Sequence, residues 1–483
     1  EQNLQDVPVA VTALDESAIE KIFARDLTDV TGKTPNLVLT PILGNGTAAI
    51  SIRGMQLNDV EKSFDPAVAV YQDGVYLQTT TGALLNVWDA ERIEVLRGPA
   101  AAVYGSDAIG GVIQLFTRKG DGESVRSIGI GLGTDNTRKI DAAFSGMTGT
   151  IDYSFGFAKE AGTGFDAQSG TTHNPDKDGY RSESANAKFG LQVSASQRVE
   201  LSALTSNVNA QYDGYGYTAS APVDDHSRLK LTGIGLNWLS QWSDTYTSRL
   251  SVTKSRDRYE TTPSPYLTET NLRGYLFQNK FQLGEHLLTA TLERREDHLS
   301  NDPIKAKRSQ DALAFGYGLA NQRHTLQLNM RRDQDSAFGG YTTGSAVYGF
   351  DLSPDLRATA SAGTAFRAPT LYQLFSEYGV STLQPETSRN LEVGLRYAEG
   401  NRRLSFMAYR NLVSSLISFG AAGPCASAYG CYTNTTQAEY TGVTLSGSQQ
   451  VGRINLHASL DLQNPRDLAT GKLLARRARQ HGT

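Results

Sequence analysis

Two neighbouring stretches decide the fold: Arg92-Ile-Glu-Val-Leu-Arg-Gly-Pro and, from residue 103, Val103-Tyr-Gly-Ser-Asp-Ala-Ile-Gly-Gly-Val-Ile. The first predicts a strand that ends in a turn at Gly98. The paired glycines at the end of the second allow tight turns and close approach of backbone segments. A further strand is predicted from Val112 to Thr117. Together these stretches indicate the end of a compact folded unit.

The residues upstream belong to the same unit. Asp15-Glu-Ser-Ala-Ile-Glu predicts a helix start, because acidic residues favour the positive end of the helix dipole. Leu27 to Thr31 predicts a second short helix. Val68-Ala-Val-Tyr-Gln-Asp-Gly-Val-Tyr predicts two strands joined by an Asp-Gly turn. We therefore expect an α+β domain over residues 1–120.

Beyond Gly120 the chain becomes a monotonous series of alternating segments, as in Ile151-Asp-Tyr-Ser-Phe-Gly-Phe. About 18 such strands are predicted, with short turns such as Ser353-Pro-Asp between them. Short turns on one rim and long loops on the other are typical of a transmembrane β-barrel. The long loops are expected at residues 161–180, 210–226, 299–306, 367–385 and 418–432.

Composition and strand length argue against several classes of protein. A net charge of −4 over 483 residues offers no basic surface for nucleic acid. No run of about 18 apolar residues exists, which excludes a transmembrane helix. A spanning barrel keeps a low average hydropathy, because lipid-facing and lumen-facing residues alternate. A soluble all-β protein is the alternative, but these strands exceed the about 9–11 residues that cross a bilayer.

Four motifs, in order, resemble the plug signature of TonB-dependent receptors: Ser51-Ile-Arg-Gly, Val70-Tyr-Gln-Asp-Gly-Val-Tyr and the two stretches quoted first. The resemblance implies a plug at 1–120 inside the lumen of an all-β barrel at 121–483. It also implies a monomer among outer-membrane lipids of a Gram-negative bacterium, with TonB–ExbB–ExbD as partner. That complex would pull the plug, because the outer membrane has no ATP.

The barrel and the plug resemble different branches of this family. Gly363-Thr-Ala-Phe-Arg-Ala-Pro and Leu383-Gln-Pro-Glu-Thr-Ser are similar to cobalamin (vitamin B12) receptors. Residues 2–14 and 64–76 look more like siderophore receptors. We expect transport of cobalamin or a related corrinoid, with a ferric siderophore as the alternative. Residues 370–385 contain no histidine, which argues against haem as the ligand.

Two departures from the family pattern stand out. No copy of the TonB box is found. The chain ends at Thr483 in about the 18th strand, whereas the family barrel has about 22 strands. Because an open sheet in lipid leaves backbone groups unpaired, we expect the barrel to be incomplete at its C-terminal end, by about four strands.

In this family, plug arginines pair with barrel glutamates. Arginine suits the role because its fork binds carboxylates through two hydrogen bonds. The alternative is a set of independently solvated charges. The resemblance implies a plug–barrel latch among Arg53, Glu94, Arg97, Glu386 and Glu392.

Cobalamin receptors use calcium to order their outer loops at positions similar to the first long loops here. Asp176-Lys-Asp-Gly resembles part of a calcium loop, in which alternate carboxylates supply oxygen ligands. Solvated acidic residues are the alternative, and no other cofactor is expected. The candidate calcium ligands are Asp166, Asp176, Asp178 and Asp213.

An aromatic outer mouth is expected to bind the substrate, because flat aromatic faces contact large planar ligands well. Its candidate residues are Tyr212, Tyr215, Tyr217, Phe375 and Tyr378. The alternative for these residues is an interfacial aromatic girdle. On the plug, the amide and hydroxyl side chains expected to bind substrate are Asn45, Thr47, Gln56 and Asn58.

Cys425 and Cys431 are expected to form a disulfide, with two free thiols as the alternative. No Gly-x-Ser-x-Gly elbow, Walker loop or His-Glu-x-x-His motif occurs, so an enzyme is not expected. A passive porin is disfavoured because a plug would block diffusion, and a structural or adhesive barrel stays open as another class.

Overall fold

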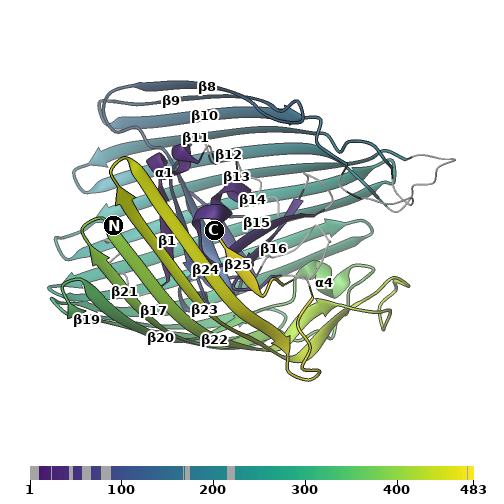
Figure 1. Cartoon of the computed structure of the whole chain (residues 1–483). Helices are drawn as coiled ribbons and strands as arrows, with labels where there is room; N and C mark the ends of the chain where they lie inside the picture. Colours follow the sequence, from purple (N-terminus) through teal and green to yellow (C-terminus); the bar gives the residue numbers. More distant parts are fainter. Residues whose placement is uncertain are drawn as a thin grey trace.

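The computed structural model describes residues 10–22, 24, 26–42, 47–56, 67–77, 87, 89–166, 168, 174–214, 223–475 and 477–483. An N-terminal unit, purple in Figure 1, lies inside a large barrel of tilted strands. The last strand of this inner unit ends at Thr117, and the first barrel strand begins at Val125.

The inner unit is built on a five-stranded sheet with the order β1-β6-β7-β4-β5. In it β4 runs parallel to β7, and the other neighbours are antiparallel. A separate hairpin joins β2 to β3. The bounds are β1 Val11–Asp15, β2 Leu37–Ile42, β3 Thr47–Ile52, β4 Val68–Gln72, β5 Val75–Leu77, β6 Ala90–Arg97 and β7 Gly111–Thr117.

Short helices complete the inner unit. The predicted helix start at Asp15 is confirmed: α1 is Glu16–Lys21, and the Asp15 carboxylate accepts a hydrogen bond from the Ala18 amide at 2.8 Å. The other helices are α2 (Leu27–Val30), the 3-10 turn η1 (Thr31–Lys33) and α3 (Ala101–Tyr104). Among the described residues, no helix has the length and apolar character needed to cross a membrane.

The remaining strands, β8 to β25, form one closed antiparallel barrel in which neighbours follow chain order. Their bounds are β8 Val125–Leu132, β9 Arg138–Thr148, β10 Ile151–Gly162, β11 Tyr180–Ser194, β12 Gln197–Tyr212, β13 Asp225–Gln241, β14 Tyr246–Thr262, β15 Tyr266–Leu283, β16 His286–Asn301, β17 Ile304–Ala320, β18 His324–Asp335, β19 Gly339–Ser353, β20 Leu356–Arg367, β21 Glu386–Glu399, β22 Arg402–Phe419, β23 Tyr432–Val451, β24 Ile454–Asp467 and β25 Gln480–Gly482.

Side chains alternate along each barrel strand between lumen and exterior. On β13, Ile234, Leu236 and Trp238 are 47%, 48% and 44% exposed, whereas Leu229 and Leu231 are buried. The exposed apolar residues recur at matched positions on neighbouring strands, which gives the exterior an apolar band. Such a band is what a lipid-embedded barrel requires.

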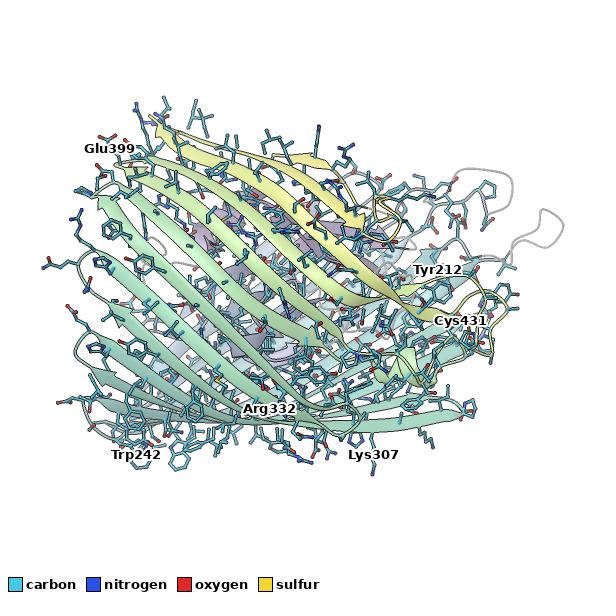
Figure 2. The ribbon with its side chains drawn as sticks, turned by 90° about the horizontal axis from the view of Figure 1, so that it is seen from below. Tyr212, Trp242, Lys307, Arg332, Glu399 and Cys431 are labelled. Carbon is cyan, nitrogen blue, oxygen red and sulfur yellow. A yellow bond between two sulfur atoms is a disulfide. The ribbon has the colours of Figure 1, made fainter. Side chains whose placement is uncertain are left out.

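The two rims differ. Figure 2 places Trp242 and Glu399 at one end of the barrel, where the turns are short, and Tyr212 and Cys431 at the other. The loop-bearing end also carries α4 (Leu371–Phe375), which follows β20. The long loop expected at 299–306 is wrong: β16 ends at Asn301 and β17 begins at Ile304. Only a two-residue turn lies between these strands.

Candidate functional site

The inner unit is fastened to the barrel wall through Arg53. The guanidinium of Arg53 donates to both carboxylate oxygens of Glu392 on β21, at 2.6 and 3.1 Å. Asn390 also donates to Glu392, at 2.8 Å, and the Arg53 guanidinium lies 4.5 Å from the centre of the Tyr409 ring. Arg53 and Glu392 are only 4% and 8% exposed. A buried two-point ion pair fixes both position and orientation.

Backbone conformation makes this approach possible. Arg53 has a positive φ of 55° at the turn that follows β3. Gly98 has φ 97°, and a Cβ there would lie 2.5 Å from Glu392 Oε1 and 3.0 Å from Arg53 Nη1. Glycine is therefore required at 98 for both reasons. Next to it, burial and the nearby charge of Arg53 lower the pKa of Arg97 to about 10.

Two further ion pairs join the inner unit to the wall. Asp107, after α3, pairs with Arg295 on β16, and both are buried. The Arg295 guanidinium also lies 4.5 Å from the centre of the Tyr76 ring. Asp73, in the β4–β5 turn, pairs with Lys188 on β11 at 2.7 Å. Neither aspartate was among the predicted latch residues, although both lie in the motifs that define the family resemblance.

Other residues expected in the latch lie in different pairs. Glu386 forms a two-point pair with Arg367 of β20, at 2.9 Å for each bond. Glu386 and Glu392 share one face of β21, but six residues place them about 20 Å apart along the strand. Glu94 pairs at 2.7 Å with Arg92, within its own strand. The structure thus brings together Arg53 and Glu392, with Arg97 beside them.

Single hydrogen bonds add to these ion pairs. The Asn36 amide donates to Asp461 of β24 at 2.7 Å. Arg477 donates to the carbonyl oxygens of Gly54 and Gln56, at 2.9 and 2.8 Å. The Ser255 hydroxyl of β14 donates to the Tyr76 carbonyl at 2.8 Å. The inner unit is therefore held from several sides of the wall.

Three of the four candidate calcium ligands meet at the loop-bearing rim. Asp166, Asp178 and Asp213 each place a carboxylate oxygen within 4.8 Å of the others. Asp178 and Asp213 are 2% and 5% exposed. Asp176 lies outside this group, and burial together with the negative charge of Asp224 raises its pKa. The group forms because the β10–β11 and β12–β13 loops leave adjacent strands at the same end.

Five of the nine residues expected to bind substrate lie at least partly within the described part of the chain. Tyr212 ends β12, Phe375 ends α4 with 46% exposure, and Tyr378 packs edge-on against Phe419 at 5.7 Å. The carbonyl of Gln56 is held by Arg477, and Thr47 begins β3. The side chain of Thr47 and the residues Asn45, Asn58, Tyr215 and Tyr217 lie outside the described residues.

Cys425 and Cys431 form a disulfide in the β22–β23 loop, with their Cα atoms 5.7 Å apart. Nearby, α4 begins with a capping box in which Thr370 and Gln373 bond each other's backbone amides. Arg308 of β17 donates to the Pro369 carbonyl at 2.6 Å. These contacts fix the entry to α4 at the outer mouth.

Comparison with known families settles the class of protein. Residues 125–482 match the TonB-dependent receptor-like β-barrel, and residues 3–112 match the TonB-dependent receptor plug domain. The chain belongs to the TonB-dependent receptors. Its inner unit is the plug, and the protein resides in the outer membrane of Gram-negative bacteria. The family consists of transporters and receptors that work with TonB, not of enzymes.

Individual relatives of this TonB-dependent receptor include two named vitamin B12 transporter BtuB. The one from Vibrio vulnificus is 27% identical over 509 residues, with 100% of this chain and 79% of its own length covered. The one from Photobacterium profundum is 25% identical, with 99% and 79% covered.

Solved structures share the fold. The siderophore receptor PirA from Acinetobacter baumannii has a TM-score of 0.82 at 19% identity and covers 97% of this chain and 82% of its own. The ferric yersiniabactin uptake receptor FyuA from Yersinia pestis has a TM-score of 0.79 at 17% identity, with 98% and 82% covered. At this identity the likeness establishes the plugged barrel and leaves the ligand open.

Proposed function

We propose that this receptor carries cobalamin or a related corrinoid across the outer membrane. The observation that supports this most is the alignment with vitamin B12 transporters, which extends through both plug and barrel. Its substrate is expected to bind at the loop-bearing rim, between the outer loops and the plug. The energy comes from TonB with ExbB and ExbD, and a single receptor chain suffices.

The plug contacts suggest how transport is gated. Arg53, Asp73 and Asp107 each form an ion pair with a different region of the barrel wall. Such buried or half-buried pairs hold the plug in one position until outside work is done on it, because separating them leaves charges without partners. Substrate shifts the loops toward a closed state only by its differential affinity for that state. Pulling by TonB then breaks the pairs.

Calcium forms a second part of the proposal. Two oxygens on opposite sides of a calcium ion lie about 5 Å apart, because each Ca–O distance is about 2.3–2.6 Å. The carboxylate oxygens of Asp166, Asp178 and Asp213, all within 4.8 Å of one another, fit this spacing. Hard carboxylate oxygens are the ligands that calcium prefers. Bound calcium would hold the β10–β11 and β12–β13 loops together and so shape the outer mouth.

The second candidate ligand is a ferric siderophore. The observation that favours it is the sequence at residues 64–76, which contains Phe64-Asp-Pro-Ala-Val-Ala-Val-Tyr and resembles siderophore receptors. The mechanism of plug release would be the same. The two candidates differ in the ligand that the outer mouth recognises.

Uptake by cells tests the proposal. The full-length receptor is expressed in a Gram-negative strain that lacks its own cobalamin receptor, and uptake of radiolabelled cyanocobalamin is measured. We expect uptake that disappears when TonB is deleted and that ferric enterobactin does not inhibit. Equal uptake with and without the receptor would contradict corrinoid transport, and receptor-dependent uptake of ferric enterobactin would favour the second candidate.

A further inference from the structure

A pocket of about 690 Å³ lies between the plug and the barrel wall. Its plug side is formed by β1, α1 and the turn η1, and its wall side by β21 to β24. Arg396 and Arg403 of the wall flank the β21–β22 turn, next to Glu399, which Figure 2 places at the short-turn end of the barrel. Short turns mark the periplasmic side of such barrels. We therefore call this cavity the periplasmic pocket.

The periplasmic pocket is rich in positive charge. Five of its lining side chains are cations, namely Lys21, Lys33, Arg97, Arg396 and Arg403. Among the described residues that line it, Asp15 is the only carboxylate, and this carboxylate caps α1 by accepting a hydrogen bond from the Ala18 amide. Within the described part of the chain, no ion pair is formed by Lys21, Lys33, Arg97 or Arg403. The positive charge of the pocket is therefore not balanced by neighbouring carboxylates.

Arg97 is the half-buried member of this group that was expected in the latch. Its Nε atom is buried and has no hydrogen-bond partner among the described residues, and the same holds for Nε2 of His457 on β24. Both side chains line the periplasmic pocket. Buried polar atoms nearly always have a hydrogen-bond partner, so these two atoms call for an explanation. An anion bound in the pocket would supply the partner that Arg97 lacks.

Strand register places further hydrogen-bond donors on the wall of the pocket. Arg396 of β21 faces Ser405 of β22. Two residues away along β22, Arg403 faces Ser448 of β23, which in turn faces His457 of β24. Neighbouring strands lie about 4.8 Å apart, and residues two apart on one strand are separated by about 7 Å. One small anion with several oxygen atoms can therefore reach donors on more than one strand.

Cations with a structural role at the plug–barrel boundary have a different environment. Arg53, Lys188 and Arg295 each contact a carboxylate across the boundary. The cations of the periplasmic pocket come from both the plug and the wall, with no carboxylate between the two sides among the described lining residues. Their mutual repulsion would be offset by a bound anion. Phosphate suits this role, because arginine forks match phosphate oxygens.

We propose that the periplasmic pocket is a phosphate site built jointly by plug and wall, and that it takes the phosphodiester of a corrinoid leaving the lumen. Lys33 and Arg97 bind the phosphate from the plug, and Arg403 and Ser448 bind it from the wall. The role in transport rests on the proposed function, since the nucleotide loop of cobalamin contains the phosphodiester. Free phosphate in the periplasm offers the same chemistry, so the experiments separate these two sources.

The first experiment maps the site with pyridoxal 5′-phosphate on the purified full-length receptor. The aldehyde forms an imine with a lysine beside the bound phosphate group, and borohydride reduction fixes the label for mass spectrometry. We expect labelling of Lys21 and Lys33 that inorganic phosphate suppresses and that falls about tenfold in Arg403→Gln. The matched control is Arg323→Gln, an exposed cation of the same rim, which should label like the wild type. Pyridoxal without phosphate should label both lysines weakly.

This first experiment judges the phosphate site without reference to corrinoids. Labelling of neither lysine, labelling that inorganic phosphate does not suppress, or undiminished labelling in Arg403→Gln would each overturn the site.

The second experiment compares cellular uptake of cyanocobalamin with uptake of dicyanocobinamide, which lacks the nucleotide loop and its phosphodiester. Lys33→Gln with Arg403→Gln removes one cation from each side of the pocket. We expect TonB-dependent uptake of cyanocobalamin to slow about tenfold, with equilibrium binding at the outer mouth and uptake of cobinamide both unchanged. Lys280→Gln with Arg323→Gln removes two exposed cations from the same rim and should match the wild type. Heat-modifiable migration on gels confirms that each variant is folded.

The two ligands distinguish a phosphate site from a general effect on the plug. Equal slowing of both ligands, or unchanged uptake of cyanocobalamin by the double variant, would overturn the role in transport. Suppression of labelling by phosphate together with unchanged uptake would assign the pocket to free phosphate. Uptake of neither corrinoid by the wild type would refute the proposed function, and the labelling result would still decide whether the site exists.

Discussion

Arg53 of the plug and Glu392 of the barrel, 339 residues apart in the chain, form a buried ion pair with two hydrogen bonds. Burial favours the neutral form of an arginine, but the carboxylate of Glu392 outweighs this effect and raises the pKa of Arg53. The ion pair therefore favours the charged form of Arg53. Because the pair joins the plug to the barrel, a substitution in it tests how firmly the plug is held in the lumen.

Breaking this pair should loosen the plug. Arg53→Met leaves Glu392 charged in a buried place, which costs about 3–5 kcal/mol. We expect lower thermal stability and leakage of small solutes through receptor-containing liposomes. The matched control is Arg410→Met, because Arg410 pairs with Glu439 on the barrel exterior and is 58% exposed. An exposed pair contributes about 0–1 kcal/mol, so the control should leak no more than the wild type.

For the other two plug–barrel ion pairs, the cost of breaking the pair should increase with its burial. Arg295→Met removes the partner of buried Asp107 and the contact with Tyr76, with an expected cost of about 3–5 kcal/mol. Lys188→Met removes a single hydrogen-bonded charge from Asp73, with an expected cost of about 1.5–3 kcal/mol. Protease cleavage of the plug under mild denaturant measures both. Greater sensitivity for the Lys188 variant would contradict this ranking.

Asp89 should make plug stability depend on pH. Burial raises its pKa from 3.8 to about 7, only partly offset by Arg118. The folded protein favours the protonated carboxyl. Asp89 therefore contributes its full stabilisation of the fold below about pH 4, and this stabilisation is lost as pH rises through about 7. In the wild type, ionisation of Asp89 should lower the free energy of unfolding by up to about 4 kcal/mol, and Asp89→Asn should abolish this decrease.

Thermal unfolding between pH 4 and 8 measures the Asp89 effect. The control is Asp121→Asn, because Asp121 is exposed and lies just after the plug. The control should keep the pH dependence of the wild type. Identical pH profiles for Asp89→Asn and the wild type would show that this carboxyl does not titrate as described.

The aspartate group should bind calcium. Asp178→Asn removes one charge from a buried ligand, and we expect calcium affinity to fall at least about tenfold by calorimetry. Glu377→Gln removes one exposed charge from the same rim and should change nothing. Because calcium binds deprotonated carboxylates, affinity should weaken as pH falls toward the acidic range. No calcium uptake by the wild type would remove this part of the account.

Much of the plug follows from local sequence signals. The helix start at Asp15, the Asp73-Gly74 turn and the strand before Gly98 depend on neighbouring residues, and the structure has all three. The prediction of a long loop at 299–306 is wrong. The flanking strands instead continue to a tight turn. The capping box Thr370-x-x-Gln373 was a missed signal for α4.

The ion pairs between plug and barrel could be predicted from the sequence only in part. Arg53 and Glu392 were both expected in the latch because of the family resemblance, but the sequence did not predict which arginine pairs with which glutamate. The partner of Asp107 is Arg295, 188 residues away, and no motif marks it. Its place opposite the plug depends on the register of β16 with its neighbours and on how the sheet curves. Such long-range partners require the closed barrel to be known.

Equilibrium binding of cyanocobalamin to the purified full-length receptor tests the central proposal most directly. Intrinsic fluorescence is followed with and without calcium, and ferric enterobactin is titrated in parallel. Corrinoid transport predicts saturable quenching by cyanocobalamin that tightens when calcium is present. Absence of cyanocobalamin binding in both conditions, with saturable binding of ferric enterobactin, would contradict it.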